Sequence, residues 1–147
     1  MNDKTVTIQD IIAKRKEVSE NVNTNLIMKA YNLAESKHHN QFRKSGESYI
    51  IHPLHVAYTL AQIGLDDNTV CAALLHDIVE DTDVTNEDLK KEFGEEIAQM
   101  VAGVTKLSNI QFTSVEEQQV EDYRKMFLAM GKDIRVIILK LADRLHN

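Results

Sequence analysis

The stretch that decides the fold is Asn68–Asp81, NTVCAALLHDIVED. Its apolar side chains recur at three- and four-residue spacing, which is typical of an α-helix packed on a core. Asp66 or Asp67 can cap this helix, which we expect to run from about residue 68 to residue 80. At about 100° per residue, four polar side chains share one arc of it: His76, Asp77, Glu80 and Asp81.

Three carboxylates and an imidazole on an otherwise apolar helix need compensation. Burying them among aliphatic side chains costs several kcal/mol unless a cation or tight partners offset the loss of water. Ala73, one turn earlier on the same face, leaves room for a ligand. The alternative is a capped helix end whose acids face water, and the unbroken apolar surroundings favour the buried site instead.

A second apolar helix, expected over about residues 132–147, repeats this pattern. Four of its polar residues lie on an arc of about 100°: Lys140, Asp143, Arg144 and Asn147. Taken alone, Asp143 would more often pair with Lys140 or Arg144 than bind a metal. His52 adds a third candidate position, because it directly precedes Pro53 at an expected helix start.

The rest of the chain also favours helices over strands. Only five glycines and one proline interrupt its 147 residues, and helical spacing of apolar residues continues almost throughout. We predict a single all-α domain with its longest loop over 106–114 and about eight helices, over residues 8–20, 24–38, 53–64, 68–80, 85–94, 95–105, 116–129 and 132–147.

Composition narrows the class of function. The net charge is −6, with 17 basic and 23 acidic residues, and the sequence has no block of lysines or arginines. This composition argues against nucleic-acid binding and makes a metal cation the more natural ligand. No signal peptide or membrane-spanning apolar run is visible. The single cysteine, Cys71, cannot form an internal disulfide, and we expect it to be buried. These features predict a cytoplasmic protein that contacts no membrane.

Four segments resemble the hydrolase domain of the Rel/Spo alarmone enzymes: Arg43–Pro53 (RKSGESYIIHP), Leu74–Thr82 (LLHDIVEDT), Gly103–Leu107 (GVTKL) and Lys140–Asn147 (KLADRLHN). Within them, His52, His76-Asp77 and Asp143 match the H…HD…D signature of the HD metal-dependent phosphohydrolases. The one clear departure is Ser48, where the family usually has proline, and it should affect loop stiffness rather than chemistry. The resemblance implies a compact helical HD-domain fold.

The resemblance also implies an activity, hydrolysis of guanosine tetraphosphate or pentaphosphate (ppGpp or pppGpp) at the 3′ position in the stringent response. The family uses one manganese ion, whose ligands here would be His52, His76, Asp77 and Asp143. A set of two imidazoles and two carboxylates with open positions suits Mn²⁺ better than a closed structural zinc. Glu80 and Asp81 would orient a water molecule and shuttle protons.

Nucleotide contacts are expected outside the metal ligands. Arg43, Lys44 and Ser45 would bind the base and phosphates, and Asn147 would contact the nucleoside. Without the resemblance, the Arg43–Ser45 turn could equally be a solvated basic turn. Lys140 would be a partner of the ligand residues.

The remaining histidines have simpler interpretations. His38 and His39 end a helix, where cations favour the dipole, so we expect them on the surface. His55 forms an H-x-x-H pattern with His52, but a metal role for it is the less favoured interpretation. His146 follows Asp143 by three residues and is expected to pack against the site.

Long Rel/Spo members continue into synthetase and regulatory domains, which this sequence lacks. The sequence therefore predicts one hydrolase domain over residues 1–147, truncated at its carboxyl-terminal end, from a bifunctional enzyme whose association with ribosomes would require the missing domains. Alternatives are a stand-alone alarmone hydrolase, an HD nucleotidase acting on another nucleotide, and a non-catalytic module that binds guanine nucleotide. The presence of Glu80 and Asp81 favours an enzyme over the last of these.

Overall fold

A computed structural model describes residues 5–38, 46, 48–108 and 134–146. The elements in these ranges are all helical, which confirms the all-α prediction: α1 (Ile8–Val18), α2 (Thr24–His38), α3 (Ile51–Gln62), α4 (Asp67–Leu75), α5 (Ile78–Asp81), α6 (Asn86–Phe93), α7 (Glu95–Ser108) and α9 (Ile134–His146). The predicted helix over 116–129 lies outside the described residues. Within the described ranges, the structure contains no helix with the length and apolar character needed to cross a membrane.

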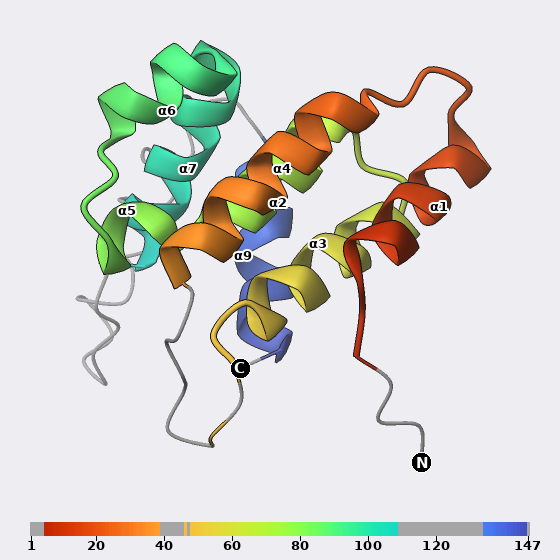
Figure 1. Cartoon of the computed structure of the whole chain (residues 1–147), viewed down its shortest axis with the longest axis horizontal. Coiled ribbons are helices and arrows are strands. Elements are labelled where there is room, and N and C mark those ends of the chain that lie inside the picture. The colour runs from red at the N-terminus through yellow and green to blue at the C-terminus, as the bar shows by residue number, and fades with distance from the viewer. Residues whose placement is uncertain (1–4, 39–45, 47, 109–133, 147) are drawn as a thin grey trace, which may run out of the picture.

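Helix α4 is the centre of the molecule. It packs against α2, α3, α7 and α9, and Figure 1 shows α6 and α7 grouped on one side of it with α1 and α3 on the other. Every residue from Thr69 to Leu75 is buried. Asp66 is the cap, since its side chain accepts a hydrogen bond from the Thr69 backbone N–H at 3.1 Å. The apolar stretch of the sequence therefore forms the core helix that its spacing predicts.

The predicted continuous helix over 68–80 is wrong, because the chain turns at His76 and Asp77 between α4 and α5. In a continuous helix the Ala73 carbonyl would accept the Asp77 N–H. Here that carbonyl lies 2.6 Å from Nδ1 of the His76 ring, which donates to it. The histidine side chain thus takes up a backbone acceptor where the helix stops, and α5 is a single turn.

Local signals set most of the other helix ends. The capping box of Thr85 and Asp88 starts α6 as predicted, and Gly94 follows its last residue with φ +96°. Pro53 is the third residue of α3, rather than its start, in the first turn where no backbone N–H is needed. Helix α7 continues to Ser108, so the predicted loop from residue 106 is wrong for its first three residues.

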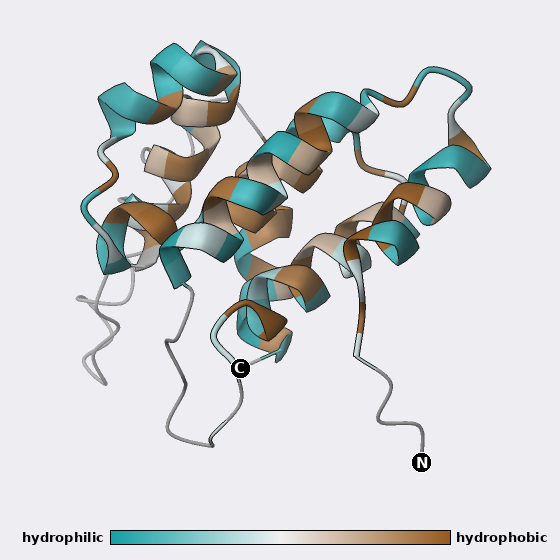
Figure 2. Ribbon diagram, viewed as in Figure 1, coloured by the Kyte–Doolittle hydropathy of each residue, from teal (hydrophilic) through white to brown (hydrophobic). Residues whose placement is uncertain are grey.

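The core is continuous from α1 to α9, with the apolar faces of the helices turned inward and the polar faces outward (Figure 2). Cys71 is buried within it as predicted, and burial raises the pKa of its thiol to about 12, so the thiol stays protonated. Helices α7 and α9 approach closely at Gly103, where an added Cβ would lie 3.1 Å from a Val136 methyl. Together with its contacts to α3 and α4, this packing holds α9 against the core and buries Asp143.

Candidate metal centre

Three buried side chains from separate parts of the chain converge on one point. His52 is in the first turn of α3, His76 follows α4, and Asp143 is in α9. Their exposed fractions are 4%, 2% and 5%, and one ligand atom of each lies within 4.8 Å of the others. Oδ1 of Asp143 is 2.6 Å from Nε2 of His52 and 3.0 Å from Nε2 of His76. The fold thus brings together three of the four side chains that the sequence predicts as ligands.

The fourth predicted ligand lies at the edge of this group. Oδ2 of Asp77 is 3.3 Å from Nε2 of His76, and the Asp77 side chain is 20% exposed. Its position one residue after His76, in the turn between α4 and α5, puts a second carboxylate beside the imidazole that faces Asp143.

Hydrogen bonds fix how the donor atoms point. Because Nδ1 of His76 donates to the Ala73 carbonyl, the neutral imidazole carries its lone pair on Nε2, the atom that faces Asp143. The other oxygen of Asp143, Oδ2, accepts a hydrogen bond from Nζ of Lys140 at 3.0 Å. The two interpretations of Asp143 are therefore compatible, since one oxygen pairs with Lys140 while the other faces the histidines.

The electrostatics of the cluster favour a bound cation or proton. Burial raises the pKa of Asp143, but hydrogen bonds from His52 and His76 outweigh it and hold that pKa well below its usual range. Burial lowers the pKa of His76, yet the hydrogen bond to Asp143 and the negative charges of Asp77 and Asp143 bring it to about 9. Without a metal, a proton on His76 compensates the carboxylates, and a divalent ion would replace that proton.

The donor set fits a divalent metal. Imidazole nitrogen and carboxylate oxygen are ordinary ligands of first-row divalent ions. The buried donors lie in α3, directly after α4 and in α9, so they are held in place by the core.

The acids of α5 lie differently from the sequence expectation. Glu80 and Asp81 are exposed, so the expected burial of three carboxylates is wrong for these two residues. The turn at His76 and Asp77 is the reason, because it ends the buried helix before they are reached. Partial burial and the charges of Asp77 and Asp81 raise the pKa of Glu80. Asp81 accepts a hydrogen bond from the Tyr49 hydroxyl at 2.5 Å, a contact that sequence reasoning missed.

Two further histidines lie beside His52. Nδ1 of His146 is 2.6 Å from Nδ1 of His52, and their rings stack with centroids 4.8 Å apart. His55 stacks against the His146 ring at 4.7 Å. His146 therefore packs against the cluster, as the sequence predicts.

The surface placement predicted for His38 is wrong, because its side chain is 1% exposed. Its ring stacks on Tyr49 at a centroid distance of 4.6 Å, so the Tyr49 ring covers this last residue of α2. His39 and the predicted nucleotide contacts Arg43, Lys44, Ser45 and Asn147 lie outside the described residues.

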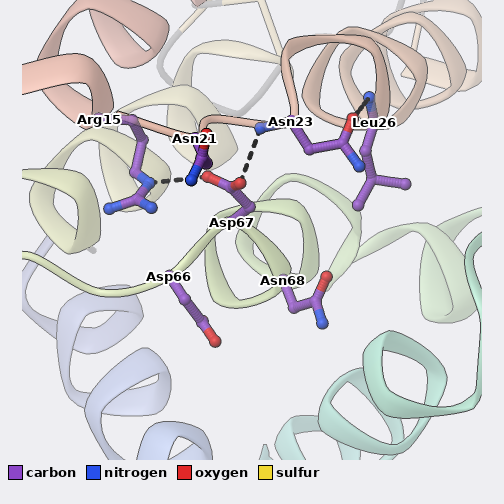
Figure 3. Close-up of a pocket in the computed structure, with 7 residues that line it drawn as sticks. All are labelled: Arg15, Asn21, Asn23, Leu26, Asp66, Asp67 and Asn68. Atoms are coloured by element: carbon purple, nitrogen blue, oxygen red, sulfur yellow. Dashed lines mark hydrogen bonds and ion pairs between the residues drawn. The ribbon is translucent and has the colours of Figure 1, made fainter. Parts of the chain in front are cut away.

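A polar recess is separate from the metal cluster. Figure 3 shows it where α1, the start of α2 and the start of α4 meet. Nε of Arg15 donates to Oδ1 of Asp67 at 2.8 Å, and the Asn23 backbone N–H donates to Oδ2 of the same carboxylate at 2.8 Å. The ion pair joins α1 to α4, and the Asn23 N–H adds the residue that precedes α2. The pair was not predicted from sequence, since its partners are 52 residues apart.

Comparison with known proteins gives consistent matches. The family described as HD domain matches residues 30–147. The chain is 54% identical over 121 residues to an Aquifex aeolicus protein named guanosine-3′,5′-bis(diphosphate) 3′-pyrophosphohydrolase, covering 82% of this chain and 17% of that protein. It is 50% identical over 121 residues to the Escherichia coli bifunctional (p)ppGpp synthase/hydrolase SpoT, with 82% and 17% covered. The chain thus spans about one sixth of the length of these relatives.

A solved structure is also similar. It belongs to a metazoan ortholog of SpoT that is described as hydrolysing ppGpp and playing a role in starvation responses. The two chains are 32% identical with a TM-score of 0.64, and the match covers 82% of this chain and 66% of the other.

Proposed function

This chain belongs to the HD domain family, as an HD domain of the Rel/Spo type, and on that premise we propose that it hydrolyses guanosine tetraphosphate or pentaphosphate. The products would be pyrophosphate and GDP or GTP, in control of the stringent response. The observation that carries the proposal is the buried convergence of His52, His76 and Asp143, all within residues 30–147, which the HD domain family matches.

We propose that the cluster holds one Mn²⁺, with Asp77 as the fourth ligand. In support, Oδ2 of Asp77 is close to Nε2 of His76, and a mixed imidazole and carboxylate set leaves positions open for substrate or water. When bound, the ion supplies Lewis acidity and positive charge beside the pyrophosphate group. The protein's own part is to fix the donors, through the Ala73 carbonyl for His76 and through Lys140 for Asp143.

Proton transfer falls to Glu80 and Asp81. The carboxylate of Glu80 would accept a proton from the attacking water, and that proton would pass to the ribose 3′-oxygen as its bond to phosphorus breaks. A raised pKa suits Glu80 to this exchange, because a group that titrates nearer to neutral pH can both take and give a proton. Asp81, held by the Tyr49 hydroxyl, would orient the water.

Other parts of the proposal rest on the Rel/Spo resemblance. Arg43, Lys44 and Ser45 would contact the base and phosphates, and Asn147 the nucleoside. Residues 1–147 would form one hydrolase domain of a bifunctional protein that also has synthetase and regulatory domains. That protein would act in the cytoplasm.

The test is product identification. Protein loaded with Mn²⁺ is incubated with guanosine tetraphosphate, and the phosphorus-containing products are resolved by ³¹P NMR. We expect pyrophosphate and GDP in equal amounts, with no reaction by His76→Ala and a normal rate for Glu87→Gln, which changes an exposed acid in α6. Release of single phosphates would identify a different nucleotidase. Binding of the nucleotide without any cleavage would identify a regulatory module.

A further inference from the structure

The inner imidazoles of the cluster are supported in two different ways. Nδ1 of His76 is held by the carbonyl of Ala73, three residues earlier in α4. Nδ1 of His52 lies 2.6 Å from Nδ1 of His146, which is 94 residues away in the last turn of α9. Both imidazoles present Nε2 to Oδ1 of Asp143.

We infer that His146 is a positioning residue, which holds His52 in the tautomer and orientation that present Nε2 to a divalent metal. The inference rests on the proposed metal site. A neutral imidazole has one N–H and one lone pair, so of two nitrogens within hydrogen-bond distance one donates and the other accepts. In this structure Nε2 of His52 donates to the Asp143 carboxylate, so a cation that binds Nε2 must displace that proton. A neutral His52 then carries its proton on Nδ1, and Nδ1 of His146 accepts it.

The surroundings of His146 favour this role. Its ring lies between His52 and His55, with centroid distances of 4.8 Å and 4.7 Å and interplanar angles of 25° and 15°. The two stacking contacts restrain the ring, so its Nδ1 stays directed at His52. His146 itself is exposed, unlike the cluster residues, so replacing it removes little of the buried core.

Its place in the helix links two ligands. His146 follows Asp143 by one turn of α9, and both touch His52, one at each ring nitrogen. Helix α9 therefore fixes both the metal-facing nitrogen and the far nitrogen of a histidine in α3. Helix α9 contacts His76 only at Nε2, through Asp143, because among the described residues the partner of its Nδ1 is the local Ala73 carbonyl.

Metal titration of the whole chain tests the inference. Chelator-treated protein is titrated with Mn²⁺ by calorimetry, and the melting temperature of each metal-free variant is measured in parallel. His146→Phe keeps a flat ring for stacking but removes the acceptor, and His146→Asn restores a hydrogen-bonding group near the position of Nδ1. His55→Ala is the matched control, because it removes a stacking contact to His146 and leaves the contact between His146 and His52.

We expect His146→Phe to weaken Mn²⁺ binding by about 10–100-fold, the range found when an outer partner of a metal ligand is lost. His146→Asn should recover most of the affinity and His55→Ala should stay within a few-fold of wild type, with metal-free melting temperatures unchanged throughout. Wild-type affinity in His146→Phe, or equal losses in His146→Phe and His55→Ala, would overturn the inference.

This titration needs no nucleotide, so the two proposals can fail separately. If wild-type protein binds Mn²⁺ and His146→Phe does not, the inference holds even where guanosine tetraphosphate is not cleaved. If wild-type protein binds no divalent ion, both the positioning role of His146 and the proposed metal-dependent function are wrong.

Discussion

Arg15 and Asp67 meet where α1, α2 and α4 come together, whereas His52, His76 and Asp143 meet between α3, α4 and α9. Both places bury ionisable side chains and both join three parts of the chain. In the first, one guanidinium faces one carboxylate, and the Asn23 backbone N–H satisfies the second oxygen. In the second, one carboxylate oxygen is shared by two imidazole nitrogens, with the Asp77 carboxylate close by.

The difference lies in whether the protein supplies its own counter-charge. The charges of Arg15 and Asp67 balance each other, so this pair stabilises the fold and needs no bound ion. The cluster gathers electron-pair donors at one point, and apart from Lys140 its positive charge must come from a proton or a metal. Two buried charge clusters of similar size therefore have different expected responses to mutation, metal and pH.

The largest expected effect comes from removing the shared carboxylate. Asp143→Asn keeps the size of the side chain but removes the charge that both histidines face, so metal binding should weaken by more than the ~100-fold upper range for an outer partner, and hydrolysis should fall below detection. Elemental analysis of protein purified without chelator measures the first effect. A full complement of metal in Asp143→Asn would show that the metal lies elsewhere.

Glu80 sharpens the comparison because it lies beside the cluster without belonging to it. Glu80→Gln removes a basic oxygen and keeps most hydrogen bonds, so metal content and nucleotide affinity should stay near wild type while turnover falls by about 10²–10⁴-fold. Measurement of kcat at saturating guanosine tetraphosphate checks this. Near-normal turnover would move the proton-transfer role to Asp81, and lost metal would mean that Glu80 is a ligand.

The balanced pair should show the opposite pattern. Arg15→Met leaves Asp67 without its buried counter-charge and should lower the free energy of unfolding by about 3 kcal/mol, at the low end for such pairs because the Asn23 N–H still binds the carboxylate. At about 2–4 °C per kcal/mol, the melting temperature should fall by several degrees. Metal content should be unchanged. Loss of metal in Arg15→Met would show that the two regions are coupled.

The metal-free protein should also lose stability as pH rises, without any change of sequence. The folded-state pKa of His76 is about 9, above its ordinary value of 6.5, so its contribution to stability is complete below about pH 6.5 and is lost as pH rises through 9. Because unfolding releases one proton in this pH range, the free energy of unfolding should fall by at most about 1.4 kcal/mol per pH unit. Chemical unfolding at pH 6.5 to 9.5 measures it, and His76→Gln should remove the slope.

Metal affinity should change over the same pH range, but it should rise with pH where the stability of the metal-free protein falls. A metal and a proton compete for Nε2 of His76, so affinity for Mn²⁺ should rise as pH approaches 9. A metal affinity that does not vary over this range would contradict the raised pKa.

Features that depend on neighbouring residues were predictable from sequence. The Thr85 and Asp88 capping box and the Asp66 cap act over three residues, and the apolar spacing of α4 sets its burial directly. The positions of His52, His76 and Asp143 were also expected together, because their residue types and order match a known signature. Their distances depend on the packing of α3, α4 and α9, which no local pattern contains.

The errors have a common physical cause. The apolar spacing continues past His76, so periodicity could not reveal that its ring takes the Ala73 carbonyl and ends the helix. The burial of His38 depends on Tyr49 stacking over it, and the contact of Tyr49 with Asp81 spans 32 residues. In each case a side chain contact replaced what the backbone pattern predicts.

The contact between His52 and Asp143 joins residues 91 positions apart. Closing a flexible loop of n residues has a chain-entropy cost of roughly (3/2)RT ln n, so a contact between such distant positions is among the later ones to form during folding. Interactions made after the folding barrier slow unfolding more than they speed folding. A cation held between α3 and α9 would thus link two distant parts of the chain, and its main effect would be to slow unfolding and lengthen the lifetime of the folded state.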